Sequence, residues 1–183
     1  MLRLIAVVLL ISALLAACQI APLRSDDSPF YKVPSGSKLR LNSKIIIPPN
    51  SVKIYIQEGQ LVAAANQYYP FCRFDVRNLK EIPQPVEPDE IEIYRTSWVT
   101  DLIAELNRHS LLAMTSRLDF GDKPSPVVYG VQMDLRSAKQ PDVFRLMCGH
   151  LQDPNIEARY LSVNQIRATL GKVFTLQLPE PKP

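Results

Sequence analysis

Hydrophobic and polar residues alternate along much of the chain with a period of two, as in β-strands that bury one face. Leu39, Leu41 and Ile45, for example, are separated by basic and polar side chains. The alternating segments are 39–47, 52–56, 61–65, 71–77, 91–99 (the weakest), 127–136, 143–148 and 173–178. The pattern predicts a domain built mainly of short strands.

Turn residues separate these segments. Pro48-Pro49-Asn50 breaks the chain before the second strand, and Glu58-Gly59 is predicted to form a tight reversal with Gly59 at positive φ. The proline-rich segment 83–88 is predicted to be a rigid surface connection.

Two segments have helical patterns instead. Ser162 and Gln165 have the spacing of a capping box, and Gly171 follows at the position where a helix ends. The segment 101–116 carries leucine and isoleucine residues spaced for one face of a helix, with a pair of strands as the alternative.

The predicted fold class is mainly β: an antiparallel sandwich or a partly open barrel with one or two short helices. A chain of 183 residues suffices for one domain. We expect this single β-rich domain over 37–178, followed by a disordered tail at 179–183.

The N-terminus has the organisation of an export signal. Arg3 precedes an apolar run from Leu4 to Ala17, which is shorter than the roughly 17–25 residues of a spanning helix. We therefore expect 1–17 to be a signal peptide, with an uncleaved membrane anchor as the alternative.

The run ends in Leu15-Ala16-Ala17-Cys18, which resembles the lipobox of bacterial lipoproteins. The resemblance implies cleavage before Cys18, a diacylglyceryl group on its thiol and a further acyl chain, such as palmitate, on its amine. Two or more chains hold a protein firmly at a membrane, at about 0.8 kcal/mol per buried methylene. In enterobacterial lipoproteins, an aspartate directly after the lipidated cysteine resembles a signal for retention in the inner membrane. This chain has Gln19 at that position, so the resemblance implies the periplasmic face of the outer membrane, with the inner membrane as the alternative.

Residues 18–36 are then expected to form the lipidated cysteine and a flexible tether, since 19–36 are rich in proline and serine and have no apolar periodicity. The net charge of +3 is too balanced to predict nucleic-acid binding.

Two cysteines remain, Cys72 and Cys148, in a compartment that permits disulfides. The alternation places Cys72 on one face with Phe74, and Cys148 on one face with Phe144 and Leu146. A structural disulfide between neighbouring strands is predicted, with two buried thiols or a redox or metal-binding pair as alternatives.

Candidate chemistry is sparse. No serine-hydrolase elbow, zinc-binding HExxH, phosphate-binding glycine loop or EF-hand loop occurs, so we predict no enzymatic activity, no cofactor and no metal site. His109, beside Ser110, has no identifiable acid partner, and His150 is interpreted as the end of a strand. The carboxylates Asp119, Asp122, Asp134 and Asp142 are scattered.

The densest aromatic segment, 68–74, is interpreted as core and edge packing. The alternative is a candidate partner surface made of Tyr69, Phe71 and Arg73, which share the outer face.

The segments 45–60, 68–79, 146–148 and 160–171 are similar to those of small, uncharacterised envelope lipoproteins of proteobacteria. This resemblance implies an envelope location and no activity. We therefore expect a lipid-anchored accessory or scaffold domain that binds a membrane or an envelope protein partner. The alternatives are a binder of an apolar or glycan ligand and an enzyme of unfamiliar type.

Overall fold

The computed structural model describes residues 25–102, 126–153 and 155–180. Within these ranges the chain forms ten strands and the helix α2 (Val163–Leu170). The strands are β1 (Ser37–Leu41), β2 (Ile45–Ile47), β3 (Ser51–Gln57), β4 (Gln60–Val62), β5 (Phe71–Lys80), β6 (Gln84–Val86), β7 (Glu90–Leu102), β8 (Val127–Arg136), β9 (Val143–Gln152) and β10 (Phe174–Gln177).

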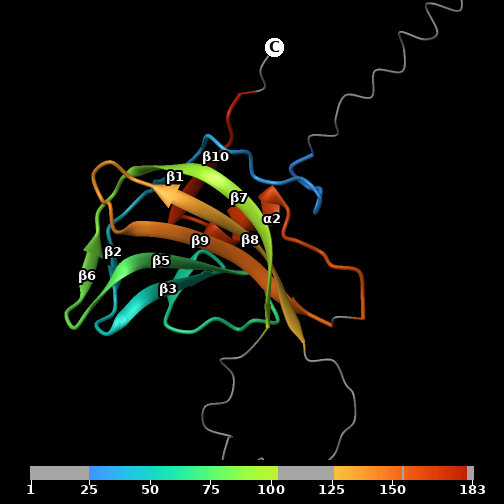
Figure 1. Cartoon of the computed structure of the whole chain (residues 1–183), viewed down its shortest axis with the longest axis horizontal. Helices are drawn as coiled ribbons and strands as arrows, with labels where there is room; N and C mark the ends of the chain where they lie inside the picture. Colours follow the sequence, from blue (N-terminus) through green and yellow to red (C-terminus); the bar gives the residue numbers. More distant parts are fainter. Residues whose placement is uncertain (1–24, 103–125, 154, 181–183) are drawn as a thin grey trace, which may run out of the picture.

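Eight strands form one antiparallel sheet in the order β10-β1-β7-β8-β9-β5-β3-β4, and β2 pairs with β6 in a second small sheet. The large sheet curls into a half-barrel (Figure 1). The predicted mainly β fold is therefore confirmed, in its partly open barrel form rather than as a sandwich.

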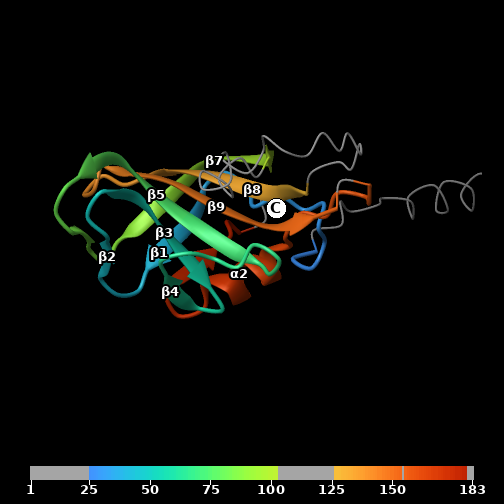
Figure 2. The ribbon, with the colours of Figure 1, turned by 90° about the horizontal axis from the view of Figure 1, so that it is seen from below.

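The main hydrophobic core lies between the concave face of the sheet and α2, which packs on one side of the sheet (Figure 2). The helix contributes Val163, Ile166 and Leu170 to this core and contacts β3, β5 and β10. Phe74 and Phe174 are the largest fully buried side chains, with ring centroids 5.2 Å apart. Burial of this apolar surface is the main driving force for the curled arrangement.

The predicted capping box is present at α2. The backbone N–H of Gln165 donates to Ser162 Oγ over 3.2 Å, and the backbone N–H of Ser162 donates to Gln165 Oε1 over 2.9 Å. Gly171 ends the helix with φ 52°. The predicted Glu58-Gly59 turn is also present, and a Cβ atom at Gly59 would lie 3.2 Å from the Gly171 Cα. The backbone of this turn therefore lies close against the backbone at the end of α2.

Strands β5 and β9 are neighbours, with Cys72 directly opposite Cys148. The two cysteines form the predicted disulfide, with Cα atoms 4.0 Å apart, below the usual range of about 4.4–6.8 Å. Both are fully buried in the main core, as the strand alternation predicted.

The prediction that Phe144 shares the face of Cys148 is wrong. The register of β5 and β9 shifts after the pair Asp75 and Arg145, so that Val76 pairs with Val143 and Phe144 is passed over. Such a bulge places one extra residue in one strand. Phe144 consequently lies against the guanidinium groups of Arg77 and Arg145 instead of entering the core.

Two other expectations need correction, and a third is tested only at its first two residues. The segment 83–88 is not merely a surface connection, because Gln84 and Val86 are buried within β6. The run 39–47 divides into β1 and β2, which belong to different sheets. The predicted helix 101–116 begins inside β7, which extends to Leu102, and its residues 103–116 lie outside the described ranges.

Residues 25–36, assigned above to a flexible tether, pack against the domain. Arg167 Nη1 of α2 donates to the Asp26 carboxylate over 2.6 Å, and the backbone N–H of Asn164 donates to the Asp26 carbonyl over 3.0 Å. Val33 is buried in the main core. Lys32 Nζ lies 4.3 Å from the ring centroid of Trp98. The N-terminal segment is thus joined to both the helix and the sheet.

Replacing both Cys72 and Cys148 with alanine should lower the free energy of unfolding by about 2–4 kcal/mol, because the disulfide restricts the unfolded chain. Urea unfolding followed by tryptophan fluorescence measures this loss. Wild-type protein unfolded in dithiothreitol is the control and should lose a similar amount. Ready thiol labelling of both cysteines in folded, non-reduced wild-type protein would contradict the assignment.

Candidate functional site

Five charged residues of alternating sign cross the convex face of the sheet in one row. In strand order from β3 to β7 they are Lys53, Asp75, Arg145, Asp134 and Arg95, each directly opposite the next. Opposite charges at facing positions stabilise strand pairing. We call this row the charge ladder.

The two carboxylates of the charge ladder are buried, since the side chains of Asp75 and Asp134 are only 7% and 4% exposed. Asp75 accepts hydrogen bonds of 3.0 Å from Arg73 Nε and Arg145 Nε. Asp134 accepts from Arg95 and, over 3.0 Å, from Gln132 Nε2. Buried charges are tolerated when they are paired in this way, so the ladder has a structural role.

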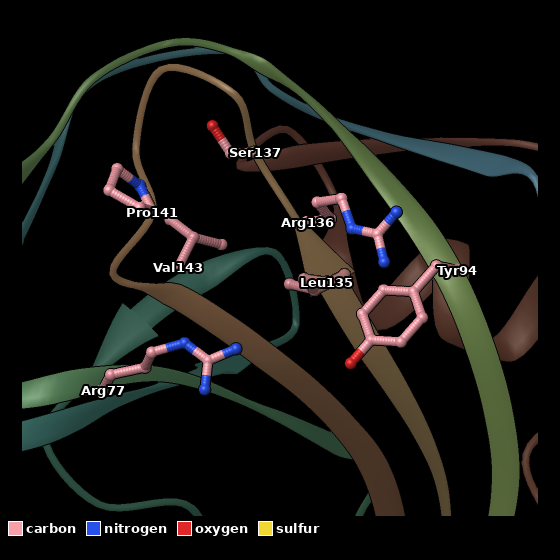
Figure 3. A pocket seen from close by; sticks show the side chains of 7 residues that line it. All are labelled: Arg77, Tyr94, Leu135, Arg136, Ser137, Pro141 and Val143. Carbon is pink, nitrogen blue, oxygen red and sulfur yellow. The ribbon is translucent and has the colours of Figure 1, made fainter.

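Beside the charge ladder lies a hollow of about 230 Å³ near the loop from β8 to β9 (Figure 3). We call it the arginine hollow, because Arg77 of β5 and Arg136 of β8 line it together with Tyr94 of β7. The remaining lining residues are Leu135, Ser137, Pro141 and Val143. Both arginines are exposed.

Each arginine of the hollow is stacked on an aromatic ring. The Arg77 Cζ lies 4.5 Å from the centroid of Phe144, and the Arg136 Cζ lies 4.7 Å from that of Tyr94. Stacking occupies the flat face of a guanidinium and leaves its N–H groups directed outward. The hollow therefore presents two positioned cationic donors.

A second hollow, of about 370 Å³, adjoins the first and shares Arg77 with it. Its lining residues are Val52, Lys53, Arg73, Asp75, Val76, Arg77, Phe144 and Arg145. Four of them are cationic and one is acidic, so this part of the convex face attracts anions.

Asp89 holds the loop that forms the rim of the arginine hollow. Its carboxylate accepts hydrogen bonds from Ser137 Oγ over 2.6 Å and from the backbone N–H of Glu90 over 2.9 Å. Burial acts to raise the pKa of the Asp89 carboxyl, but these hydrogen bonds, a further one from Gln140 and the charge of Lys139 together hold the pKa below its ordinary value.

The predicted partner-surface residues do not form one exposed patch. Tyr69 is 59% exposed, whereas Phe71 is 2% exposed. Phe71 packs in a small apolar cluster on the convex face with Met147 and Leu151. Arg73 binds Asp75. Of the three residues, Tyr69 offers the largest accessible surface, and a partner at this segment stays a prediction.

The histidines and remaining carboxylates were weak candidates. His150 lies within β9 rather than at its end, and its burial lowers the pKa of the imidazole. Asp142 binds Lys80 and Asn78 on the surface. Cys18, His109, Ser110, Asp119 and Asp122 lie outside the described residues.

Sequence reasoning missed the arginine hollow. The strand alternation directed Arg77 away from the core but gave no reason to join it to Tyr94 and Arg136, which are distant in sequence. The available signal was that outward-facing arginines recur near the ends of the segments 71–77 and 127–136. Only the order of strands in the sheet places these ends together.

Comparisons with known proteins identify no relative: no family model, no curated protein and no solved structure matches this chain. Within the described ranges, no helix is long and apolar enough to span a membrane. The same ranges contain no group of three or more histidine, cysteine or acidic residues arranged to hold a metal ion.

The Asp89→Asn variant should be less stable than wild type near pH 6 and should approach wild-type stability as the pH falls toward 3. The folded-state pKa of Asp89 is lowered, so its stabilisation is complete above the unfolded-state pKa of about 3.9 and is lost as the pH falls through the folded-state value. Melting temperatures of both proteins between pH 3 and 6 test this. A difference independent of pH would show that the lost contacts, and not the charge, matter.

Proposed function

We propose that this protein is anchored in the bacterial envelope by lipid chains on Cys18 and acts as a non-enzymatic accessory domain that binds an envelope partner. The lipobox-like segment ending at Cys18 supports the anchor. The Cys72–Cys148 disulfide fits an oxidising compartment such as the periplasm.

The observation that carries the proposal is the docking of residues 25–36 against the domain. Asp26 is held by Arg167 and Asn164 of α2, only eight residues after the cysteine. An extended chain of that length spans at most about 28 Å. A lipid on Cys18 would therefore hold the domain close to the membrane surface, as suits a protein that acts on a membrane-associated partner.

The convex face is where we place the partner. Tyrosine and arginine are enriched in protein interfaces, because they combine large contact area with hydrogen bonding. Tyr69 is exposed two residues before Phe71, which belongs to the small apolar cluster, and Arg77 and Arg136 are exposed at the arginine hollow of the convex face. A partner that binds these residues would leave the main core, on the concave side of the sheet, and the disulfide undisturbed.

Replacing Cys18 with serine should prevent lipidation and move the protein from the detergent phase to the aqueous phase in a Triton X-114 partition of cell envelopes. Wild-type protein should also incorporate labelled palmitate, whereas the serine variant should not. The matched control is Cys72→Ala/Cys148→Ala, which removes the two disulfide-bonded cysteines and should keep the lipid. If the Cys18→Ser variant stays membrane-bound after a carbonate wash and has the same gel mobility as mature wild-type protein, the proposed anchor is wrong.

A further inference from the structure

We infer that the arginine hollow binds a phosphate or phosphate monoester between Arg77 and Arg136. This inference concerns the ligand chemistry of the convex face, and it does not depend on the lipid anchor. It rests on the pairing of charges around the hollow, on the way the two guanidinium groups are held, and on the size of the space.

The carboxylates around the hollow are already engaged elsewhere. Asp75 and Asp134 belong to the charge ladder, Asp89 binds Ser137 and Lys139, and Asp142 binds Lys80 and Asn78. Among the described residues, no carboxylate forms an ion pair with either arginine of the hollow.

Glu92 lies directly opposite Arg136 in the pairing of β7 with β8. No ion pair joins the two side chains, and the Arg136 guanidinium lies over the ring of Tyr94 instead. In this stacked position the N–H groups of Arg136 are better placed to donate to a ligand in the hollow than to the Glu92 carboxylate across the strand pair.

The geometry favours a ligand that reaches both arginines. In Figure 3 the Arg77 guanidinium and the hydroxyl end of Tyr94 face the hollow from opposite sides, and Arg136 extends beside the tyrosine ring. Because each guanidinium is already held by stacking, less side-chain entropy is lost when an anion binds. Planar guanidinium groups donate paired hydrogen bonds to phosphate oxygens.

Charge and volume select the ligand class. A phosphate monoester carries about −1.5 to −2 charges at pH 7, which matches two arginines, whereas a carboxylate would neutralise only one. The hollow measures about 230 Å³, below the range of about 300–1,000 Å³ that is typical of sites for drug-sized molecules. Ser137 is not available as a donor, because its hydroxyl donates to Asp89. Arg77, Arg136 and Tyr94 are therefore the groups that would hold the phosphate.

The test is isothermal titration of inorganic phosphate into the detergent-solubilised full-length protein. We expect saturable binding of about one phosphate per chain, and Arg77→Gln and Arg136→Gln should each weaken it at least tenfold. The matched control is Arg40→Gln, which removes an exposed arginine of β1 and should leave the affinity unchanged. Both hollow variants should stay folded, with only a small drop in melting temperature from the lost ring stacking, because neither arginine forms an ion pair in the described structure.

A vesicle assay with the Cys18→Ser variant distinguishes a lipid phosphate from a soluble one. Association with phosphatidic-acid vesicles that is lost in Arg77→Gln would identify a lipid head group, whereas phosphate binding without vesicle association would identify a soluble ester. The inference is overturned if phosphate does not bind saturably at millimolar concentration, or if Arg40→Gln weakens binding as much as Arg77→Gln does. The second outcome would indicate diffuse attraction by the surface.

Discussion

The register between β5 and β9 is the constraint on which the rest of the structure depends. Because side chains alternate along a strand, pairing Cys72 with Cys148 also assigns every neighbouring residue to a face. Phe74 and Leu146 enter the main core beneath α2, while Asp75 and Arg145 meet on the convex face. A slip of one residue would bury an arginine in the core and separate the cysteines. The disulfide and the charge ladder therefore stabilise the same pairing from opposite faces.

The bulge at the end of this pairing connects the register to the candidate site. Passing over Phe144 lets Val143 return to the core and leaves the Phe144 ring on the convex face, where Arg77 stacks on it. Arg77 of β5 thereby lines the same hollow as Tyr94 of β7 and Arg136 of β8. In the sheet, β9 lies between β5 and β8. The proposed phosphate site thus depends on this bulge and on a second register shift, between Ile93 and Arg95 of β7, where Tyr94 lies. The two carboxylates of the charge ladder lie next to this site and are buried and paired with other arginines. They therefore do not compete for Arg77 and Arg136.

Much of this fold follows from local patterns in the sequence. The period-two alternation predicted the strands and the facing cysteines, and the Ser162 capping box predicted α2. The alternation could not reveal the bulge, because an extra residue is defined only against its partner strand. It also missed β6, since prolines usually exclude a strand, yet Pro85 lies in a two-stranded ribbon that tolerates them. The arginine hollow joins residues from four strands, and strand order is a tertiary property that no local pattern contains.

Nuclear Overhauser effects between α-protons test the central register most directly. In antiparallel sheets the α-protons of pairs without mutual backbone hydrogen bonds lie close together, and the short Cα distance of Cys72 and Cys148 marks them as such a pair. Two residues further on, Phe74 faces Leu146 and should give the same cross-peak. Observation of both cross-peaks is the result this account predicts. A cross-peak from Phe74 to Met147 or to Arg145 instead would contradict the register, and with it the composition of the core, the charge ladder and the arginine hollow.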